Sequence, residues 1–445
     1  MPIIEETEIT IIETIDDIPD TPVWKRWLVV MTAALLFFYT FLQLNMFNTI
    51  SGDLMRDFSI DATQFSALSS LYFYGNFFLL FPAGLLLDRF STRHLILFAM
   101  SIAIITMFGF AFSHSIFWLS INRFLSGVTG AFAFLSAIRL ASRWFEAKHM
   151  ALASGFIVTV AMIGGMIAQT PVEILSNANG WRTTIMSMGW LGIAIFILMF
   201  FVIRNWPAEV TTEQYENEKE LAQTGFWKSI RIVVFNRYNW LGGAYTAFMN
   251  LPIFLLGALW GSMYLVDTEH ISQTQASYVI TMIFLGTIVG SPFVGWISDR
   301  LETRVFPMAG GALLSLITIL IIIFIPHLSM LTLLGLFFLL GLLTSAQVLS
   351  YPTIAELNSP LVTGSAISII SLVIMASGFI FQPVFGWFMD LQWKHVLIKK
   401  IPVYSIQDFH HAMIIMPIAF AVSIGIAFLL KETNCRSQTT VDDLL

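Results

Sequence analysis

Two short charged segments interrupt long apolar stretches and share one pattern. GLLLDRFSTR covers residues 84–93, and GWISDRLETR covers residues 295–304, 211 positions later. An Asp and two Arg at helix ends can bridge neighbouring helices and hydrogen-bond the exposed C-terminal carbonyls, where the helix dipole favours cations. Because the cluster is repeated, we expect a conformational latch with little direct ligand contact; charges that merely anchor loops in water are the alternative. The latch residues are Gly84, Asp88, Arg89, Arg93, Gly295, Asp299, Arg300 and Arg304.

Arg123 is the one acidic or basic residue well inside an apolar stretch. If that stretch spans a membrane, burying the charge costs at least about 2.5–3.5 kcal/mol, so the side chain should face the protein interior or a wet cavity. It could attract a carboxylate or phosphate of a ligand, or tune coupling to an ion. It could equally extend outward or bond to backbone carbonyls of a neighbouring helix. The sequence leaves these roles open.

Neutral polar residues within apolar stretches are better pointers to a pocket than charges. Tyr39 and Gln43 share one helix face at i, i+4, and Asn45 and Asn48 share another. Each residue taken singly is expected to hydrogen-bond between helices. Gln169 and Gln382 stand 213 positions apart in matching surroundings, GGMIAQ and SGFIFQ, and are expected to line a pocket or to join helices symmetrically. Further residues of this kind are Tyr72, Tyr74, Asn76, Asn250, Trp260, Tyr264, Gln347 and Tyr351.

The elements that must position these residues follow from composition. Hydrophobic residues make up 57% of the 445 residues and charged residues 11%, whereas soluble domains carry about 25% charged residues. About 20 apolar residues make one membrane-spanning helix. Twelve such spans are predicted, at 27–50, 65–87, 95–113, 117–140, 150–172, 183–203, 239–265, 275–297, 306–325, 330–350, 363–386 and 411–430. In the eleventh, QPVFGWFMD leaves open an early break, and no Asp or Glu falls within any predicted span.

The chain therefore divides into five predicted parts. An acidic tail (1–26) precedes a six-helix bundle (27–203), a linker (204–238), a second six-helix bundle (239–430) and a C-terminal tail (431–445). The linker holds ten charged residues and ends in FWKSIRIVVFNRYNW, which is typical of an amphipathic helix lying in the membrane interface.

Orientation follows from the basic residues, which are enriched in cytoplasmic loops. With both termini in the cytoplasm, 16 Lys and Arg lie on the cytoplasmic side and 5 on the outer side. Both latch segments are then cytoplasmic. The expected location is the inner membrane of a bacterium.

Several motifs together resemble one family. GLLLDRFSTR is similar to the G-x-L-x-D-R-x-x-x-R loop between spans two and three of the major facilitator superfamily, and GWISDRLETR to its weaker copy between spans eight and nine. NRFLSGVTGA resembles the family's R-x-x-x-G-x-x-G pattern through Arg123, Gly127 and Gly130. The resemblance implies an all-α membrane protein whose twelve helices form two pseudo-symmetric six-helix bundles, with a solute bound between them. Spans one, four, seven and ten would line the cavity, so the binding candidates are Tyr39, Gln43, Asn45, Arg123, Trp260 and Gln347.

The function expected from these features is secondary transport by alternating access. The solute is predicted to be small, polar and organic, such as an amino acid, short peptide or carboxylate, and to be taken up. Whether protons are coupled is left open, because the sequence shows no buried carboxylate. Export of a metabolite, siderophore or drug is the alternative, and a non-transporting receptor is a further one.

Enzymatic activity is not expected. The sequence contains no G-x-S-x-G, H-E-x-x-H or Cys/His grouping, and its single cysteine, Cys435, excludes an internal disulfide. We expect no cofactor, no metal and no nucleic acid; the partners are a small-molecule solute and the lipid bilayer, and the protein is expected to be a monomer.

Overall fold

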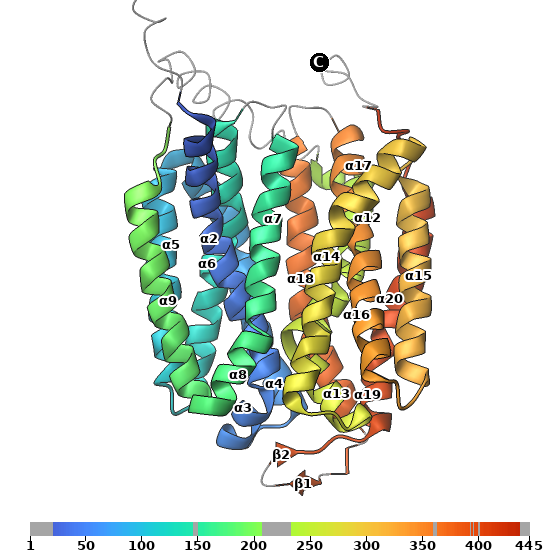
Figure 1. Ribbon diagram of the computed structural model, residues 1–445. Coiled ribbons are helices and arrows are strands. Elements are labelled where there is room, and N and C mark those ends of the chain that lie inside the picture. The colour runs from blue at the N-terminus through green and yellow to red at the C-terminus, as the bar shows by residue number, and fades with distance from the viewer. Residues whose placement is uncertain are drawn as a thin grey trace, which may run out of the picture.

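The computed structural model describes residues 21–145, 150–206, 233–358, 363–391, 393–394, 396–398 and 401–436. In this part of the chain, twelve helices are long and apolar enough to cross a membrane, as the sequence predicts. The helices stand side by side (Figure 1). The first membrane helix begins and the last one ends at the same side of the bundle, here called the termini end. A short β-hairpin marks the opposite side, called the hairpin end (Figure 1).

The first half of the bundle consists of the helices that precede residue 207. They are α2 (Val23–Thr49), α3 (Ser51–Phe58), α4 (Ala62–Arg89), α5 (Thr92–Ala111), α6 (Ile116–Trp144), α7 (Met150–Ile167), α8 (Thr170–Asn179) and α9 (Trp181–Val202). Side-chain caps set several starts: Asp61 accepts a hydrogen bond from the Gln64 amide, and Ser115 from the Trp118 amide. Gly180 separates α8 from α9 with a φ of 77°, which a side chain would strain.

The second half follows residue 232. Its elements are α12 (Arg237–Met249), π-helix η2 (Ile253–Trp260), α13 (Gly261–Glu269), α14 (Gln273–Leu301), α15 (Val305–Phe324), α16 (Met330–Thr344), 3₁₀-helix η3 (Ser345–Leu349), α17 (Ser350–Glu356), α18 (Thr363–Asp390), β1 (Leu397–Ile398), β2 (Ile401–Pro402), α19 (Ile406–Met413) and α20 (Ile415–Leu429). The seventh and tenth spans are therefore interrupted by other helix types, whereas α2 and α6 of the first half are uninterrupted α-helices.

Matching glycines place helix pairs at backbone contact in both halves. A Cβ at Gly75 of α4 would overlap the Phe124 carbonyl of α6, and one at Gly286 of α14 would overlap the Phe338 carbonyl of α16. These glycines are 211 positions apart, the same offset as the two latch segments. Small residues let membrane helices approach closely, so the internal repeat seen in sequence reappears as equivalent packing of α4 on α6 and α14 on α16.

The observed helix boundaries differ from the predicted ones in several places. The eleventh span does not break at QPVFGWFMD, because α18 continues through Pro383 to Asp390; prolines are tolerated in membrane helices where neighbouring groups satisfy the freed backbone. Helices also extend beyond the apolar stretches, which brings Glu173 and Asp267 inside helical spans. Residues 226–232 of the predicted amphipathic helix and most of both tails lie outside the described residues, and the end of that segment, from Arg237, belongs to α12.

Candidate transport pathway between the two halves

The π-helix η2 lies at the boundary between the halves and begins directly after Pro252. Two of its backbone carbonyls accept side-chain hydrogen bonds: Gln382 Nε2 donates to Phe254 O, and Gln169 Nε2 donates to Gly257 O, both at 2.9 Å. π-Helical turns often occur at functional sites. The repeated glutamines therefore both join helices through one irregular segment, one from its own half and one across the boundary.

A polar layer seals the boundary toward the hairpin end. Asn48 Nδ2 of α2 donates to Gln169 Oε1 at 2.7 Å and to Ser262 Oγ at 2.9 Å. The Ser262 amide returns a hydrogen bond to Asn48 Oδ1 at 2.8 Å. We call Asn48, Gln169, Ser262 and the Gly257 carbonyl the hairpin-side gate. All three side chains are buried, so opening this gate requires breaking hydrogen bonds that lie out of water.

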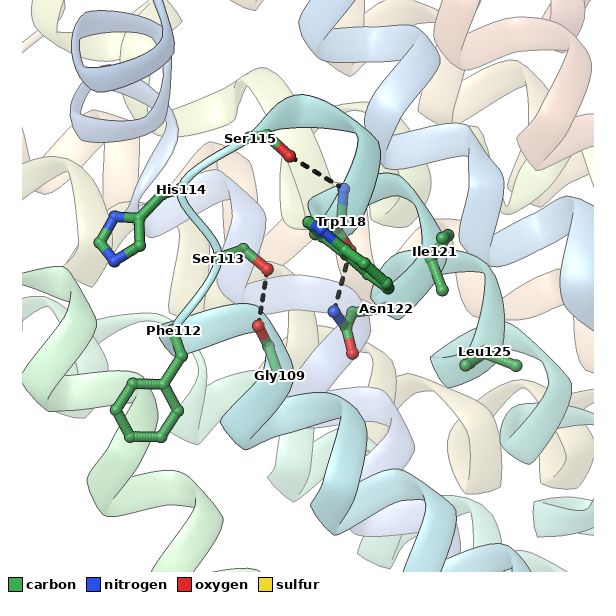
Figure 2. Close-up of a pocket in the computed structure, with 9 residues that line it drawn as sticks. All are labelled: Gly109, Phe112, Ser113, His114, Ser115, Trp118, Ile121, Asn122 and Leu125. Carbon is green, nitrogen blue, oxygen red and sulfur yellow. Dashed lines mark hydrogen bonds between the residues drawn. The ribbon is translucent and has the colours of Figure 1, made fainter.

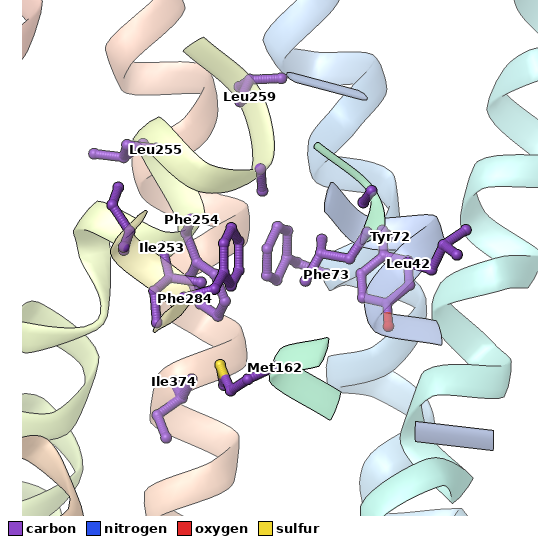
Figure 3. Packing of buried hydrophobic residues seen from close by; sticks show 14 of the residues in the cluster. Leu42, Tyr72, Phe73, Met162, Ile253, Phe254, Leu255, Leu259, Phe284 and Ile374 are labelled. Carbon is purple, nitrogen blue, oxygen red and sulfur yellow. The ribbon is translucent and has the colours of Figure 1, made fainter. Parts of the chain in front are cut away.

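An apolar cluster continues the seal toward the middle of the bundle. The rings of Phe73 in α4 and Phe254 in η2 meet with centroids 4.6 Å apart, and Met162, Phe284 and Ile374 lie around them (Figure 3). Side chains from both halves thus interlock here without polar groups.

The boundary also contains two of the six binding candidates. The Trp260 indole Nε1 donates to Ser66 Oγ of α4 at 3.1 Å, and the ring is fully buried. Asn45 donates from Nδ2 to the Phe41 carbonyl at 2.7 Å, which leaves its Oδ1 turned toward Gly257. Asn45 Oδ1 has no hydrogen-bond partner among the described residues. Trp260 and Asn45 are therefore placed where the halves meet.

Of three other candidates, Tyr39 and Gln43 face their own half. The Tyr39 hydroxyl donates to the Met188 carbonyl at 3.1 Å, and Gln43 Nε2 donates to the Ala103 carbonyl at 2.8 Å. Gln347 lies in η3 and is largely buried. Tyr39 and Gln43 thus hold α2 against α9 and α5, and solute contact by any of the three stays a prediction.

Arg123 bonds to backbone carbonyls of neighbouring helices, which is one of the roles that the sequence left open. Its Nη1 donates to Gln43 O at 2.7 Å, Nη2 to Leu44 O at 3.2 Å and Nε to Ser69 O at 3.3 Å. The guanidinium also lies 3.8 Å from the ring centroid of Phe47, and the side chain is 1% exposed. Carbonyls of α2 and α4 and an aromatic face therefore surround the charge. It clamps both helices to α6.

The second latch segment forms a polar network at the termini end. Arg304 Nη2 contacts Glu356 Oε1 at 2.7 Å, and Nη1 contacts Asp299 Oδ1 at 2.8 Å. Glu432 accepts hydrogen bonds from the amides of Arg304 and Val305, both at 2.9 Å. Burial alone would raise the pKa of Glu432, but these bonds and that from Thr303 lower it to about 2.

Contacts of the remaining latch residues are simpler. The Arg93 side chain donates to the Phe200 carbonyl at 2.8 Å, and its amide donates to Asn205 Oδ1 at 2.9 Å. Arg300 lies over the Trp296 ring at 5.3 Å, and a Cβ at Gly84 or Gly295 would meet open space. The side chains of Asp88 and Arg89 lie outside the described residues. The Arg93 contacts join α5 to the region of α9, and the Arg300 contact lies within α14; release during a transport cycle stays a prediction.

A separate hollow lies away from the boundary between the halves. It measures about 700 Å³ and is lined by Phe112, His114, Trp118 and Asn122, among others, at the turn between α5 and α6 (Figure 2). Phe112 and Trp118 are strongly exposed on the flank of the first half. This hollow therefore faces the surroundings of the bundle and does not belong to the boundary between the halves.

The model of the Major Facilitator Superfamily matches residues 33–266 and 245–439. The chain belongs to the Major Facilitator Superfamily. It has that superfamily's fold of twelve membrane helices in two six-helix bundles, so it is a multi-pass membrane protein.

Relatives within the superfamily are distant. The probable hexose phosphate transport protein of Chlamydia pneumoniae is 20% identical over 56% of this chain and 59% of its own length. The membrane sensor protein UhpC of Escherichia coli is 21% identical over 62% and 65%, respectively. The probable galactarate/D-glucarate transporter GudP of Bacillus subtilis is 27% identical over 60% and 65%. The matches thus span less than two-thirds of each relative's length.

Solved structures of the superfamily share the fold. A bacterial homolog of the human lysosomal transporter Spinster, in an inward-facing and unoccupied conformation, superposes with a TM-score of 0.74. It is 16% identical, and the alignment covers 92% of this chain and 98% of that one. The occupied, inward-facing form of that homolog gives a TM-score of 0.70 at 14% identity, with 92% and 97% covered.

Sequence reasoning missed two features of this superfamily member. Glu173 is buried in α8, where its Oε1 accepts a hydrogen bond from Asn177 Nδ2 at 2.7 Å; its position between Thr-Pro and a polar run was the available signal. Tyr404 and Asp390 reach from the second half to the start of α4. Nothing in their local sequence indicates that contact.

Proposed function

We propose that the protein is a secondary carrier that takes up a small polar organic solute by rocking its two bundles against each other. The observation that carries this proposal is the hairpin-side gate, in which buried polar side chains of both halves bond directly to each other. A boundary of hydrogen bonds between two pseudo-symmetric bodies can separate as a unit, which is what alternating access requires. The termini end would open when the hairpin end is closed.

The proposed orientation places the hairpin end outside the cell. It rests on the distribution of Lys and Arg, 16 against 5 in favour of the termini end. A bacterial inner membrane is the corresponding location. A cysteine placed in the hairpin and labelled in intact cells by a membrane-impermeant maleimide tests this orientation, and labelling only after cell lysis would reverse it.

The proposed solute carries several hydroxyl or amino groups. Asn45 Oδ1 and Gln382 Oε1 flank η2, and both are buried acceptors without a partner among the described residues. Both amide nitrogens are committed to backbone carbonyls, which can only accept, so the oxygens are the free atoms. Such acceptors match O–H or N–H donors. Two relatives are named as a probable hexose phosphate transport protein and a probable galactarate/D-glucarate transporter. These names favour polyhydroxylated acids, and amino acids and short peptides remain in the proposed class because they carry N–H donors.

Uptake into proteoliposomes tests the proposal. The probes are radiolabelled D-glucarate, glucose 6-phosphate, threonine and dialanine, with adipate as a control that matches D-glucarate in carbon chain and carboxylates but lacks hydroxyls. We expect saturable uptake and counterflow of at least one donor-rich probe and none of adipate. Equal uptake of adipate would contradict the proposed recognition. Repeating the assay with an imposed pH gradient shows whether protons are coupled.

A non-transporting sensor is the second candidate. The match to the membrane sensor protein UhpC favours it. Binding of a probe without flux or counterflow would support the sensor and overturn the carrier. Uptake into vesicles of opposite orientation distinguishes import from export.

A further inference from the structure

The connection between α18 and α19 crosses from the second half to the first. It contains the β1–β2 hairpin, in which Leu397 pairs with Pro402 and Ile398 with Ile401. The hairpin lies at the end of the bundle beneath α3 and the start of α4 (Figure 1), and β2 contacts α3. A segment of one half thus covers the edge of the other.

Two side chains at the ends of this connection bind the start of α4. The Tyr404 hydroxyl donates to Asp390 Oδ1 at 2.9 Å and accepts a hydrogen bond from the Ala62 amide at 2.8 Å. Asp390 Oδ2 accepts one from the Thr63 amide at 2.7 Å. The first amides of a helix have no partner within it, and here the other half of the molecule supplies the acceptors. We call Asp390 and Tyr404 the clasp.

The clasp is also packed against the pathway. Tyr404 is 2% exposed, and its ring lies 5.2 Å from that of Trp393 and 6.3 Å from that of Trp260. Trp260 in turn donates to Ser66, one turn after the clasped start of α4. The first turns of α4 are therefore held to the second half by three successive contacts. The carboxylate acceptor strengthens the contact with the Thr63 amide.

We propose that Asp390 and Tyr404 are positioning residues that hold the hairpin-side gate shut, and that the clasp must release before a solute can enter from that side. This inference rests on the proposed rocking of the two halves. The gate and the clasp attach to different helices, α2 and α4, so the clasp resists separation at a second point of the boundary. Its loss should shift the population toward a state open at the hairpin end.

The experiment follows the accessibility of a buried position at the boundary, whose partner Thr170 directly follows Gln169 of the gate. Ser277 of α14 is 1% exposed and donates to Thr170 of the first half at 3.3 Å. In a C435S background, S277C is labelled from the hairpin side with a membrane-impermeant maleimide. Loss of two hydrogen bonds, one to a charged acceptor, should raise the labelling rate of Y404F roughly tenfold. D390N, which keeps the side-chain size and removes the charge, should raise it in the same direction.

Tyr264 supplies the matched control. It is equally buried at 2% exposed, and its hydroxyl donates to the Ile322 carbonyl at 2.9 Å, wholly within the second half. Y264F should therefore lower the melting temperature, though less than Y404F because it loses one hydrogen bond and not two, while leaving the labelling rate of S277C unchanged. A parental rate in both Y404F and D390N, or an equal increase in Y264F, overturns the clasp. If Y404F and D390N are labelled faster but the parent protein shows no solute flux, the carrier function is refuted and the clasp stands.

Discussion

Replacing Arg123 distinguishes a structural clamp from an anion site. Its guanidinium makes three hydrogen bonds to carbonyls of α2 and α4, at 2.7 to 3.3 Å. Because these carbonyls also accept hydrogen bonds within their own helices, each bond should contribute about 1 kcal/mol, below the range usual for a charged donor. R123K keeps the buried charge but cannot reach three acceptors with one ammonium group. We expect it to lose about 2 kcal/mol, since about two of these bonds are lost.

Replacing Arg123 with methionine removes the buried charge that R123K keeps. R123M loses all three bonds but also removes a buried charge and its desolvation cost, and the carbonyls that it leaves still belong to helices. The melting temperature of the purified protein should therefore fall more in R123K than in R123M. A loss of about 2 kcal/mol corresponds to roughly 4–8 °C for a half of this size, if the half unfolds cooperatively. Affinities for anionic and neutral solutes should change by the same factor in each variant.

Two results would refute this reasoning. If R123K kept its melting temperature and lost binding of D-glucarate or glucose 6-phosphate alone, Arg123 would be an anion-binding residue. If R123M were far less stable than R123K, the clamp would depend on the charge itself rather than on the geometry of the guanidinium fork. Binding is measured by thermal shift across a solute concentration series, so stability and affinity come from the same samples.

Three further predictions use matched positions in the chain. Q169L should accelerate labelling of S277C about tenfold, because Gln169 bonds across the boundary. Q382L should lower the melting temperature without changing that labelling, because Gln382 bonds within its own half. Equal labelling of the two variants would refute the assignment. G127A should reduce folded yield, since a Cβ there overlaps a backbone carbonyl of α4, and G84A should not, since its Cβ meets open space; size-exclusion profiles compare them. Glu432, whose pKa is lowered to about 2, stabilises the fold above pH 4.5 and loses that contribution as the pH falls toward 2. E432Q should therefore flatten the acid limb of stability against pH, and an unchanged limb would contradict this.

The membrane helices were predictable because span length and hydropathy report directly on the thickness of the bilayer. The capped start of α6 at Ser115 and the equivalent glycines of the two halves follow equally local rules. Sequence also identified Gln169 and Gln382 as a related pair. It could not say which neighbour each one reaches, because that depends on helix rotation and on partners far away in the chain. Of the two roles expected for this pair, helix joining corresponds to the bonds that both make to η2.

Other parts of the site had no local signal. The π-helix η2 is read from backbone hydrogen bonding, and its sequence IFLLGALW has the composition of any apolar helix. Arg123 allowed several roles, because a lone buried charge needs compensation from some source, whether ligand, water or backbone dipoles. The clasp joins residues more than 300 positions apart. Such contacts arise from the packing of two complete bundles, which single-helix reasoning does not reach.

The π-helix gives the two halves unequal mechanical character. A widened turn in the seventh span rotates every residue that follows it relative to a regular α-helix, and the first span is uninterrupted at the equivalent place. Because the halves differ in this way, the state open at the hairpin end cannot be formed by giving each half the conformation of the other. In the proposed transport cycle, the half with the uninterrupted first span would move as a rigid body, and the other half could bend within its seventh span. A solute, even one with twofold symmetry, meets an asymmetric host at every stage of the cycle.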